Sequence, residues 1–258
     1  MSKKLYYRRT KLSTKISWTA THNADGTIIP GETWNPTTGC SKISAGCASC
    51  YAERLSLRFG WSSKPWTAKN AAENVILHPT RLRKPYSWKG PKRVFVNSMS
   101  DLFHEQIPDD FISQVFAVMN DLPQHTFQIL TKRPERAAQW EGPWTENIWQ
   151  GTSIEDRKSL HRIDTLRTCP AKTRFLSIEP LLESLGVLDL TGIQWVIVGG
   201  ESGANFRPMP HAWAREIRDQ CVTQGIAFFF KQSAAFKTEC GTLLEEADGS
   251  TSLWQQYP

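Results

Sequence analysis

Three closely spaced cysteines constrain this chain more than any other feature of its sequence. Cys40, Cys47 and Cys50 follow the spacing C-x6-C-x2-C, so a single loop can bring all three thiols to one metal centre. A closed structural zinc site takes four ligands, and a four-iron cluster usually takes four cysteines. Three cysteines therefore predict a cluster with one iron free for another ligand, a zinc site completed by a distant residue, or ordinary free thiols.

The composition is that of a globular protein in a reducing compartment. The chain has 258 residues, 40% of them hydrophobic, which is enough for one large core. We expect no membrane span, because no run of about eighteen apolar residues occurs. The amino-terminal segment lacks the apolar core of a signal peptide, so we expect a cytoplasmic protein. In that compartment six cysteines favour metal or catalytic use of the clustered three over a disulfide framework.

The charge favours a polyanionic partner, with nucleic acid as the first candidate. The formal net charge is +6 and the isoelectric point is about 9.0, although a merely basic protein has the same balance. Some of the eleven tryptophans could stack on bases, and others pack in the core. Residues 1–15 form a predicted flexible basic arm that contacts phosphates or serves as a solubilising tail.

Short apolar runs alternate with amphipathic helical stretches from residue 93 onward. This rhythm predicts a parallel sheet covered by helices. The fold class is thus α/β, a parallel (β/α) partial TIM-type barrel of about six strands with the cysteine loop after the first strand. The predicted strands cover residues 93–97, 126–130, 147–150, 174–178, 195–198 and 226–230, and the helices between them cover residues 110–122, 154–167 and 212–224.

The ends of the chain are less regular. Ile16–Thr19 is a predicted short strand, and residues 22–32 are a turn-rich insertion in which Asp25-Gly26 is a hairpin signal. Two helices are predicted over residues 51–59, ending at Gly60, and over residues 67–77. Residues 16–236 then form the barrel domain, and residues 237–258 form an extension that closes one end of the barrel or hangs loose.

Polar or glycine residues follow every predicted strand. In parallel α/β folds, ligands bind beyond the carboxyl ends of the strands. These segments therefore predict one polar pocket, although Ser100, Asp101 and Ser153 are also plausible helix caps. The segments are residues 97–101, 131–133, 151–153, 177–180, 199–203 and 231–232.

A three-cysteine loop after the first strand of a parallel partial barrel resembles the radical S-adenosylmethionine (SAM) superfamily. The common signature there is C-x3-C-x2-C, so the first interval is three residues longer here. The Cys50-Tyr51 pair is similar to the end of the motif in spore photoproduct lyase, a DNA-repair member. The whole chain also resembles a phage and prophage family of poorly assigned function that has a three-cysteine motif. The matching segments are residues 34–40, 46–54, 96–103, 130–134, 151–153 and 197–203.

The resemblance implies a mechanism. Cys40, Cys47 and Cys50 would hold a [4Fe-4S] cluster whose free iron chelates SAM. One electron, from a reductant such as flavodoxin or ferredoxin, would cleave SAM to methionine and a 5′-deoxyadenosyl radical, which abstracts hydrogen from the substrate. Tyr51 would pack beside the cluster and limit solvent.

The resemblance also implies, by position along the barrel, which residues contact SAM. Residues after the second strand would take the amino group, and those after later strands would take the ribose, carboxylate or adenine. A positive charge at Lys132 and Arg133 suits the SAM carboxylate or a substrate phosphate. The predicted cofactor-binding residues are Ser98, Asp101, Lys132, Thr152, Ser153, Glu179 and Glu201.

The basic charge and the phage context of the resembled family favour a nucleic-acid substrate. One hypothesis is radical rearrangement or isomerisation of a hypermodified base in phage DNA, by a phage-encoded protein acting in the host cytoplasm. Repair of damaged DNA is another.

Three other functions fit the sequence. The first is a non-catalytic nucleic-acid-binding protein whose zinc is held by the three cysteines and by His22, His104 or Cys169. The second is a cluster protein that only transfers electrons. The third is a metal-free hydrolase that uses Glu179 and Glu201 as paired carboxylates.

Overall fold

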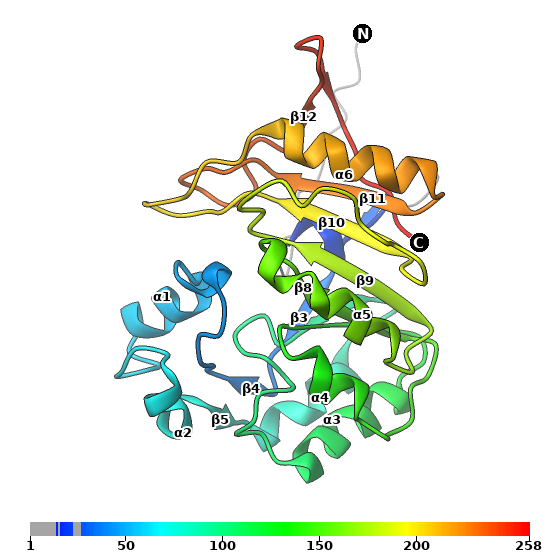
Figure 1. Ribbon diagram of the computed structural model, residues 1–258. Coiled ribbons are helices and arrows are strands. Elements are labelled where there is room, and N and C mark those ends of the chain that lie inside the picture. Colours follow the sequence, from blue (N-terminus) through cyan, green and yellow to red (C-terminus); the bar gives the residue numbers. More distant parts are fainter. Residues whose placement is uncertain (1–13, 15, 23–26) are drawn as a thin grey trace, which may run out of the picture.

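A seven-stranded parallel sheet, curled into a half-barrel, forms the body of the protein (Figure 1). The computed structural model describes residues 14, 16–22 and 27–258. The predicted arm and the Asp25-Gly26 turn therefore lie almost entirely outside the described residues. The strand order is β11-β10-β9-β8-β7-β6-β3. The strands are β3 (Glu32–Trp34), β6 (Arg93–Val96), β7 (Thr126–Thr131), β8 (Ile148–Ser153), β9 (Thr173–Ile178), β10 (Trp195–Gly199) and β11 (Ala227–Gln232).

The six predicted strands are confirmed, but the position predicted for the first strand is wrong. Residues 17–19 form a 3-10 helix, η1 (Ser17–Thr19), because the Thr19 hydroxyl donates to the Ile16 carbonyl at 2.7 Å and closes a turn. The first strand is β3, which pairs with β6 through Trp34 and Val96. The preceding hairpin, β1 (Thr21–His22) with β2 (Ile28–Ile29), lies outside the barrel sheet.

Both faces of the sheet are buried, which explains the nearly continuous apolar runs. Inside the half-barrel, aromatic side chains from neighbouring strands pack around Trp18 of η1, including Phe95, Phe175 and Trp195. On the outer face, aliphatic residues of the same strands pack against the helices in two larger clusters.

Helices α3 (Asp109–Asp121), α4 (Pro134–Ala138), α5 (His161–Arg167) and α6 (His211–Thr223) accompany the strands (Figure 1). The first and last of these match their predicted ranges to within one residue. The helix predicted over residues 154–167 is shorter, because Asp156 makes a capping box with Ser159 and starts a separate 3-10 turn, η5 (Arg157–Ser159). No helix in the described part of the chain is both long and apolar enough to cross a membrane.

The cysteine region lies beyond the carboxyl ends of the strands, where the arrowheads of β9 and β10 point toward α1 (Figure 1). It contains η2 (Ala45–Cys47), the predicted helix α1 (Tyr51–Arg58), η3 (Ala68–Asn70), α2 (Ala71–Asn74) and η4 (Pro79–Ser87). The helix predicted over residues 67–77 ends at Asn74. The next residues form β5 (Ile76–Leu77), because they pair with β4 (Thr37–Thr38) just before the cysteines.

The carboxyl-terminal extension covers one edge of the sheet. After the hairpin of β12 (Leu244–Glu245) and β13 (Thr251–Ser252), the chain runs antiparallel to β11. The Phe230 amide donates to the Trp254 carbonyl at 2.7 Å, and the Gln256 amide donates to the Phe228 carbonyl at 3.0 Å. These bonds satisfy an edge that would otherwise be open.

Candidate cofactor-binding cavity

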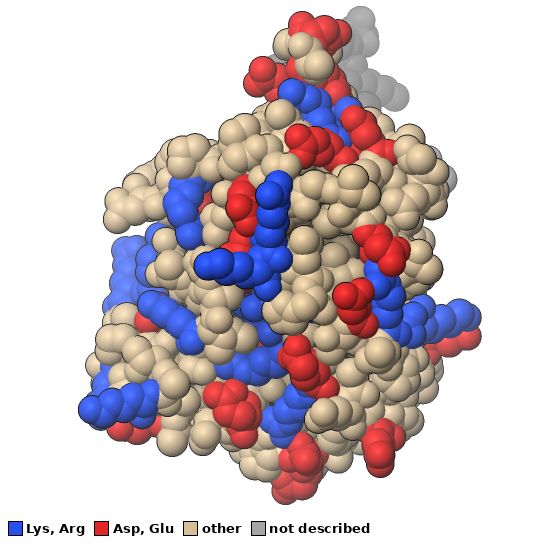
Figure 2. All heavy atoms as spheres, viewed as in Figure 1, with Lys and Arg blue, Asp and Glu red and all other residues tan. Residues whose placement is uncertain are grey.

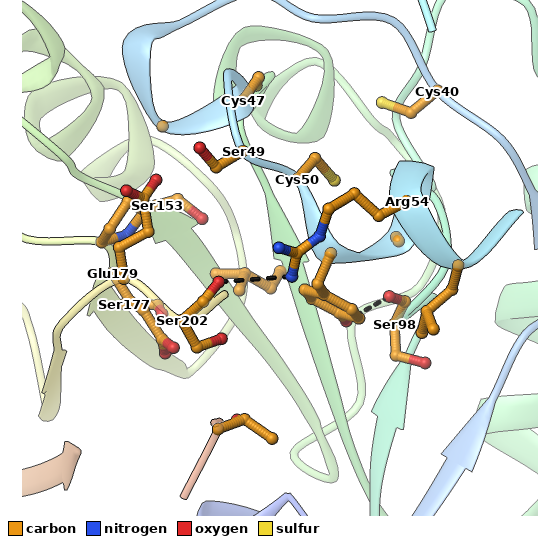
Figure 3. Close-up of a pocket in the computed structure, with 18 of the residues that line it drawn as sticks. Cys40, Cys47, Ser49, Cys50, Arg54, Ser98, Ser153, Ser177, Glu179 and Ser202 are labelled. Carbon is orange, nitrogen blue, oxygen red and sulfur yellow. Dashed lines mark hydrogen bonds between the residues drawn. The ribbon is translucent and has the colours of Figure 1, made fainter. Parts of the chain in front are cut away.

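A cavity of about 880 Å³ lies at the carboxyl ends of the strands. The cysteine loop and α1 form one wall, and the residues that follow β6 to β11 form the other (Figure 3). Its floor includes apolar side chains of the barrel interior, among them Trp18, Phe95 and Leu130. Nine of the predicted site residues line it: Cys40, Cys47, Cys50, Ser98, Asp101, Lys132, Ser153, Glu179 and Glu201.

Thr152 is the predicted site residue that the structure does not bring to the cavity. Its hydroxyl donates to the Thr131 carbonyl at 2.9 Å, and the side chain is fully buried. Ser153, the next residue along β8, lines the cavity instead. Successive side chains on a strand point to opposite faces, so position after a strand does not by itself select the right neighbour.

The cysteine loop begins at a residue that must be glycine. Gly39 has φ = +86°, and a Cβ atom there would lie 1.8 Å from the Asn74 carbonyl oxygen. Its amide donates to the Met99 carbonyl at 3.0 Å. The start of the loop is thereby joined to the segment that follows β6.

Two of the three thiols are held mainly as neutral groups. Burial, reinforced by the nearby Asp101 carboxylate, raises the pKa of Cys40 to about 12. Burial also raises the pKa of Cys50. A cation nevertheless lies close to Cys40, since Nη1 of Arg133 is 3.7 Å from its Sγ atom. That guanidinium could compensate the charge of a metal-bound thiolate.

Cys47 differs from the other two thiols. Burial raises the pKa of Cys47, but the charge of Lys132 and hydrogen bonds from the Ile43 and Ser44 segment lower it by more, so the pKa lies below its ordinary value. The Cys47 Sγ atom lies 3.5 Å from the Ser44 hydroxyl. A lowered pKa favours the thiolate, which is the form that binds metals.

The three cysteines line one cavity, but in this structure their thiols do not converge on one point. Among the described residues, no three Cys, His, Asp or Glu side chains converge closely enough to hold one metal ion. A zinc site needs four ligands within about 2.3 Å of the metal. The candidates for the fourth ligand do not line the cavity: His104 bonds to Ser41, Cys169 lies in the core, and His22 stacks on Tyr257.

Glu155, which the sequence analysis missed, joins the cysteine loop to the sheet. Its carboxylate is fully buried. It accepts from the Ser44 hydroxyl at 2.8 Å, pairs with Lys132, and accepts from Arg162 Nη1 at 3.0 Å. Gly46 packs so closely that a Cβ atom there would lie 2.5 Å from Glu155 Cγ. The sequence signal for Glu155 as a site residue was its position two residues after the end of β8.

The Asp101 carboxylate accepts four hydrogen bonds from within the protein. Its Oδ1 accepts from the Thr131 hydroxyl at 2.6 Å and from the Phe103 amide at 3.0 Å. Its Oδ2 accepts from the Lys132 amide at 3.1 Å and from Arg133 Nη1 at 3.2 Å. These four bonds use the main acceptor positions of a carboxylate, so Asp101 fixes the backbone of Lys132 and the guanidinium of Arg133.

Ser98 and Asn97 lie at the end of β6. The Ser98 hydroxyl bonds to Asn35, and its carbonyl accepts from the Tyr51 hydroxyl. Asn97 adopts φ = +62° and lines the cavity. Its Oδ1 atom is buried and has no hydrogen-bond partner among the described residues. A buried acceptor without a partner is costly.

Glu179 and Glu201 are each held by a cation of their own. Glu179 Oε1 accepts from Lys231 Nζ at 2.6 Å. Glu201 accepts from the Arg207 amide at 2.8 Å and pairs with its guanidinium. Although burial raises the pKa of Glu201, the bonds from Arg207 lower it by more, and the pKa falls below its ordinary value. This arrangement does not favour the paired acid and base of a hydrolase.

A parallel half-barrel with a thiol-lined cavity at the carboxyl ends of its strands defines an α/β protein built around a ligand site. The chain belongs to the family described as "Protein of unknown function (DUF5131)", whose model matches residues 13–258.

No curated protein matches the chain. One similar solved structure is a mutant of spore photoproduct lyase with bound AdoMet and dinucleoside spore photoproduct, at 13% sequence identity and a TM-score of 0.41. The match covers 73% of this chain and 60% of that one, so this chain spans less than two thirds of its neighbour.

Proposed function

We propose that this protein is a radical SAM enzyme that acts on a base of DNA. Cys40, Cys47 and Cys50 would hold a [4Fe-4S] cluster, and the same cavity would take SAM and the substrate base. The observation that carries the proposal is the placement of three thiols from one loop on one wall of a cavity of about 880 Å³, opposite polar strand ends. When bound, the cluster and SAM supply a 5′-deoxyadenosyl radical that takes a hydrogen atom from the substrate.

The protein's own residues supply charge balance around the thiols. Arg133 lies beside Cys40, and Lys132 lowers the pKa of Cys47. Asp101 and Glu155 keep these two cations in place. Three thiolates bring negative charge into a partly buried site, and paired cations reduce the cost of that burial.

The cavity combines an apolar floor with polar groups that can orient a ligand. Ligand cavities typically measure about 300–1,000 Å³, so this one has space at the upper end of that range. Its apolar floor favours a base or an adenine ring. The hydroxyls of Ser98 and Ser153 and the Glu179 carboxylate are the groups that we assign to SAM.

The assignment to DNA rests on the net charge of +6 and on the chemistry of the cavity. The reactions that we propose are rearrangement or isomerisation of a modified base, or repair of a damaged one. A flavodoxin or ferredoxin would be the reductant.

The test is anaerobic purification with iron and sulfide analysis, followed by reduction with dithionite in the presence of SAM. A brown protein with about four irons that forms 5′-deoxyadenosine supports the proposal. A colourless protein with one tightly bound zinc contradicts it and favours a nucleic-acid-binding zinc protein.

A further inference from the structure

Two of the cationic side chains that line the cavity have no carboxylate partner among the described residues. The other four are paired: Lys42 with Glu53, Lys132 with Glu155, Arg133 with Asp101 and Lys231 with Glu179. Arg54 and Arg58 are the unpaired ones, and both are exposed. They lie four residues apart on α1, so they project from the same side of the helix. Their charges are available to an anionic ligand.

Arg54 lines both the main cavity and a side groove of about 240 Å³. Its guanidinium reaches across to the loop after β10, where Nη2 lies 3.4 Å from the Ser202 carbonyl oxygen (Figure 3). Gly203 leaves room for it, because a Cβ atom there would lie 2.0 Å from Arg54 Nη1. An anion bound by Arg54 would therefore lie at the edge of the main cavity.

Two exposed aromatic residues follow Arg58 in the sequence. The Arg58 guanidinium lies 5.7 Å from the centre of the Phe59 ring. Phe59 and Trp61 have ring centres 5.2 Å apart, and their exposed fractions are 56% and 58%. Large aromatic side chains this exposed are not core residues. Together with the two arginines they form what we call the α1 strip: Arg54, Arg58, Phe59 and Trp61.

We infer that the α1 strip binds a single-stranded segment of DNA. The two arginines would bind consecutive phosphates, and the rings would stack on unpaired bases, so that a neighbouring base can enter the cavity. Cationic groups interleaved with exposed aromatic rings are the usual means of binding single strands. This inference rests on the proposed function, which assigns a DNA base to the cavity.

The charges around the strip complement such a strand. Glu53, the acidic residue of α1, is buried and neutralised by Lys42. Basic side chains lie on the side of the molecule where α1 lies, with few acidic ones beside them (Figure 2). In a duplex the bases are stacked on each other, so the rings of Phe59 and Trp61 could not reach them. The strip therefore suits a single strand.

The test is fluorescence anisotropy with a labelled oligothymidylate, using the protein as purified anaerobically. We expect the double variant Arg54→Gln/Arg58→Gln to lose at least about tenfold in affinity. The slope of log affinity against log salt should become less negative by about 1.4, because each phosphate contact contributes about 0.7 for single strands. The variant Phe59→Ala/Trp61→Ala should lose about tenfold with an unchanged slope, because stacking is not ionic.

Lys172→Gln is the matched control. Lys172 is exposed and directly precedes β9, at the opposite end of the strands from the cavity. Its loss removes one positive charge and should leave binding unchanged. Thermal unfolding of each variant shows that it is folded, which we expect because all four residues of the strip are exposed.

Several outcomes would overturn the inference. One is binding that is unaffected by the arginine variants. Others are equal affinity for a duplex of the same length, or equal affinity for the RNA strand. A lower affinity of Arg54→Gln for SAM with unchanged DNA binding would place Arg54 in the cofactor site instead. If the strip binds DNA as expected but no 5′-deoxyadenosine forms, the proposed radical chemistry fails and the DNA-binding surface stands.

Discussion

The guanidinium of Arg133, at the end of β7, lies 3.7 Å from the Sγ atom of Cys40, on the loop that follows β4. Cys40 and Arg133 are 93 residues apart in the sequence. The same guanidinium donates to the Ser41 hydroxyl at 2.9 Å and to Asp101 at 3.2 Å. The cysteine loop is therefore held to the sheet by charged groups, and the site depends on them for its shape.

Glu155→Gln should destabilise the protein. The substitution leaves Lys132 and Arg162 without their buried counter-charge, and breaking a buried ion pair costs about 3–5 kcal/mol. Thermal and denaturant unfolding measure the loss. Glu146→Gln is the control, because Glu146 makes an exposed pair with Lys172 that contributes at most about 1 kcal/mol. Equal stability of the two variants would contradict the structural role of Glu155.

Cys47→Ser should abolish cluster loading, because three thiolates are the minimum donor set that the loop provides. Iron and sulfide analysis after anaerobic reconstitution checks this. Cys240→Ser is the matched control, since Cys240 is half-buried and does not line the cavity. A Cys47 variant that keeps about four irons would refute the assignment of the three cysteines.

Asp101→Ala should lower both the affinity for SAM and the stability of the protein. The substitution leaves the Thr131 hydroxyl and the Lys132 amide without their acceptor. It also removes one of the two carboxylates that hold the Arg133 guanidinium, the other being Glu105. Buried donors left unpaired cost about 1–3 kcal/mol, and Arg133 would be held less firmly beside Cys40. Isothermal titration with SAM and thermal unfolding give the two readouts. Lower stability with unchanged SAM affinity would restrict Asp101 to a structural role.

Glu246 should make stability depend on pH at the acid end. Hydrogen bonds from Arg218 and Ser252 lower the pKa of Glu246 from 4.5 to about 2. Because the folded-state pKa lies below the unfolded one, the contribution is fully present above about pH 4.5 and is lost as the pH falls toward about 2. The pair is partly exposed, so we expect about 1 kcal/mol.

Comparison of Glu246→Gln with the wild type measures this contribution. The variant should unfold more readily at pH 6, and the difference should shrink as the pH falls below about 4.5. Asp248→Asn, on the same hairpin, controls for the cationic partner alone, because hydrogen bonds from Ser250 lower the pKa of Asp248 and no cation pairs with it among the described residues. A difference that stays constant from pH 6 to pH 3 would contradict the role of the Arg218 pair.

The parallel α/β half-barrel and the edge of the sheet that carries the cavity could be predicted from the sequence. Six strands were predictable because a parallel strand that is buried on both faces has a continuous apolar run, as Trp195–Gly199 does. The gathering of Lys132, Ser153 and Glu179 was predictable because parallel strands end at one edge. The three cysteines lie within eleven residues of one another. Their placement on one cavity wall could therefore be predicted without knowledge of long-range contacts.

Which side chains face the cavity, and which partners they take, could not be predicted without the three-dimensional fold. Thr152 turns into the sheet while Ser153 faces the cavity. Ser44 and Glu155 are 111 residues apart, and Arg54 reaches a carbonyl 148 residues away. Local periodicity carries no information on such pairs, because their contact depends on how the loop packs on the sheet. The same packing decided that Arg54 and Arg58 have no carboxylate partner among the described residues.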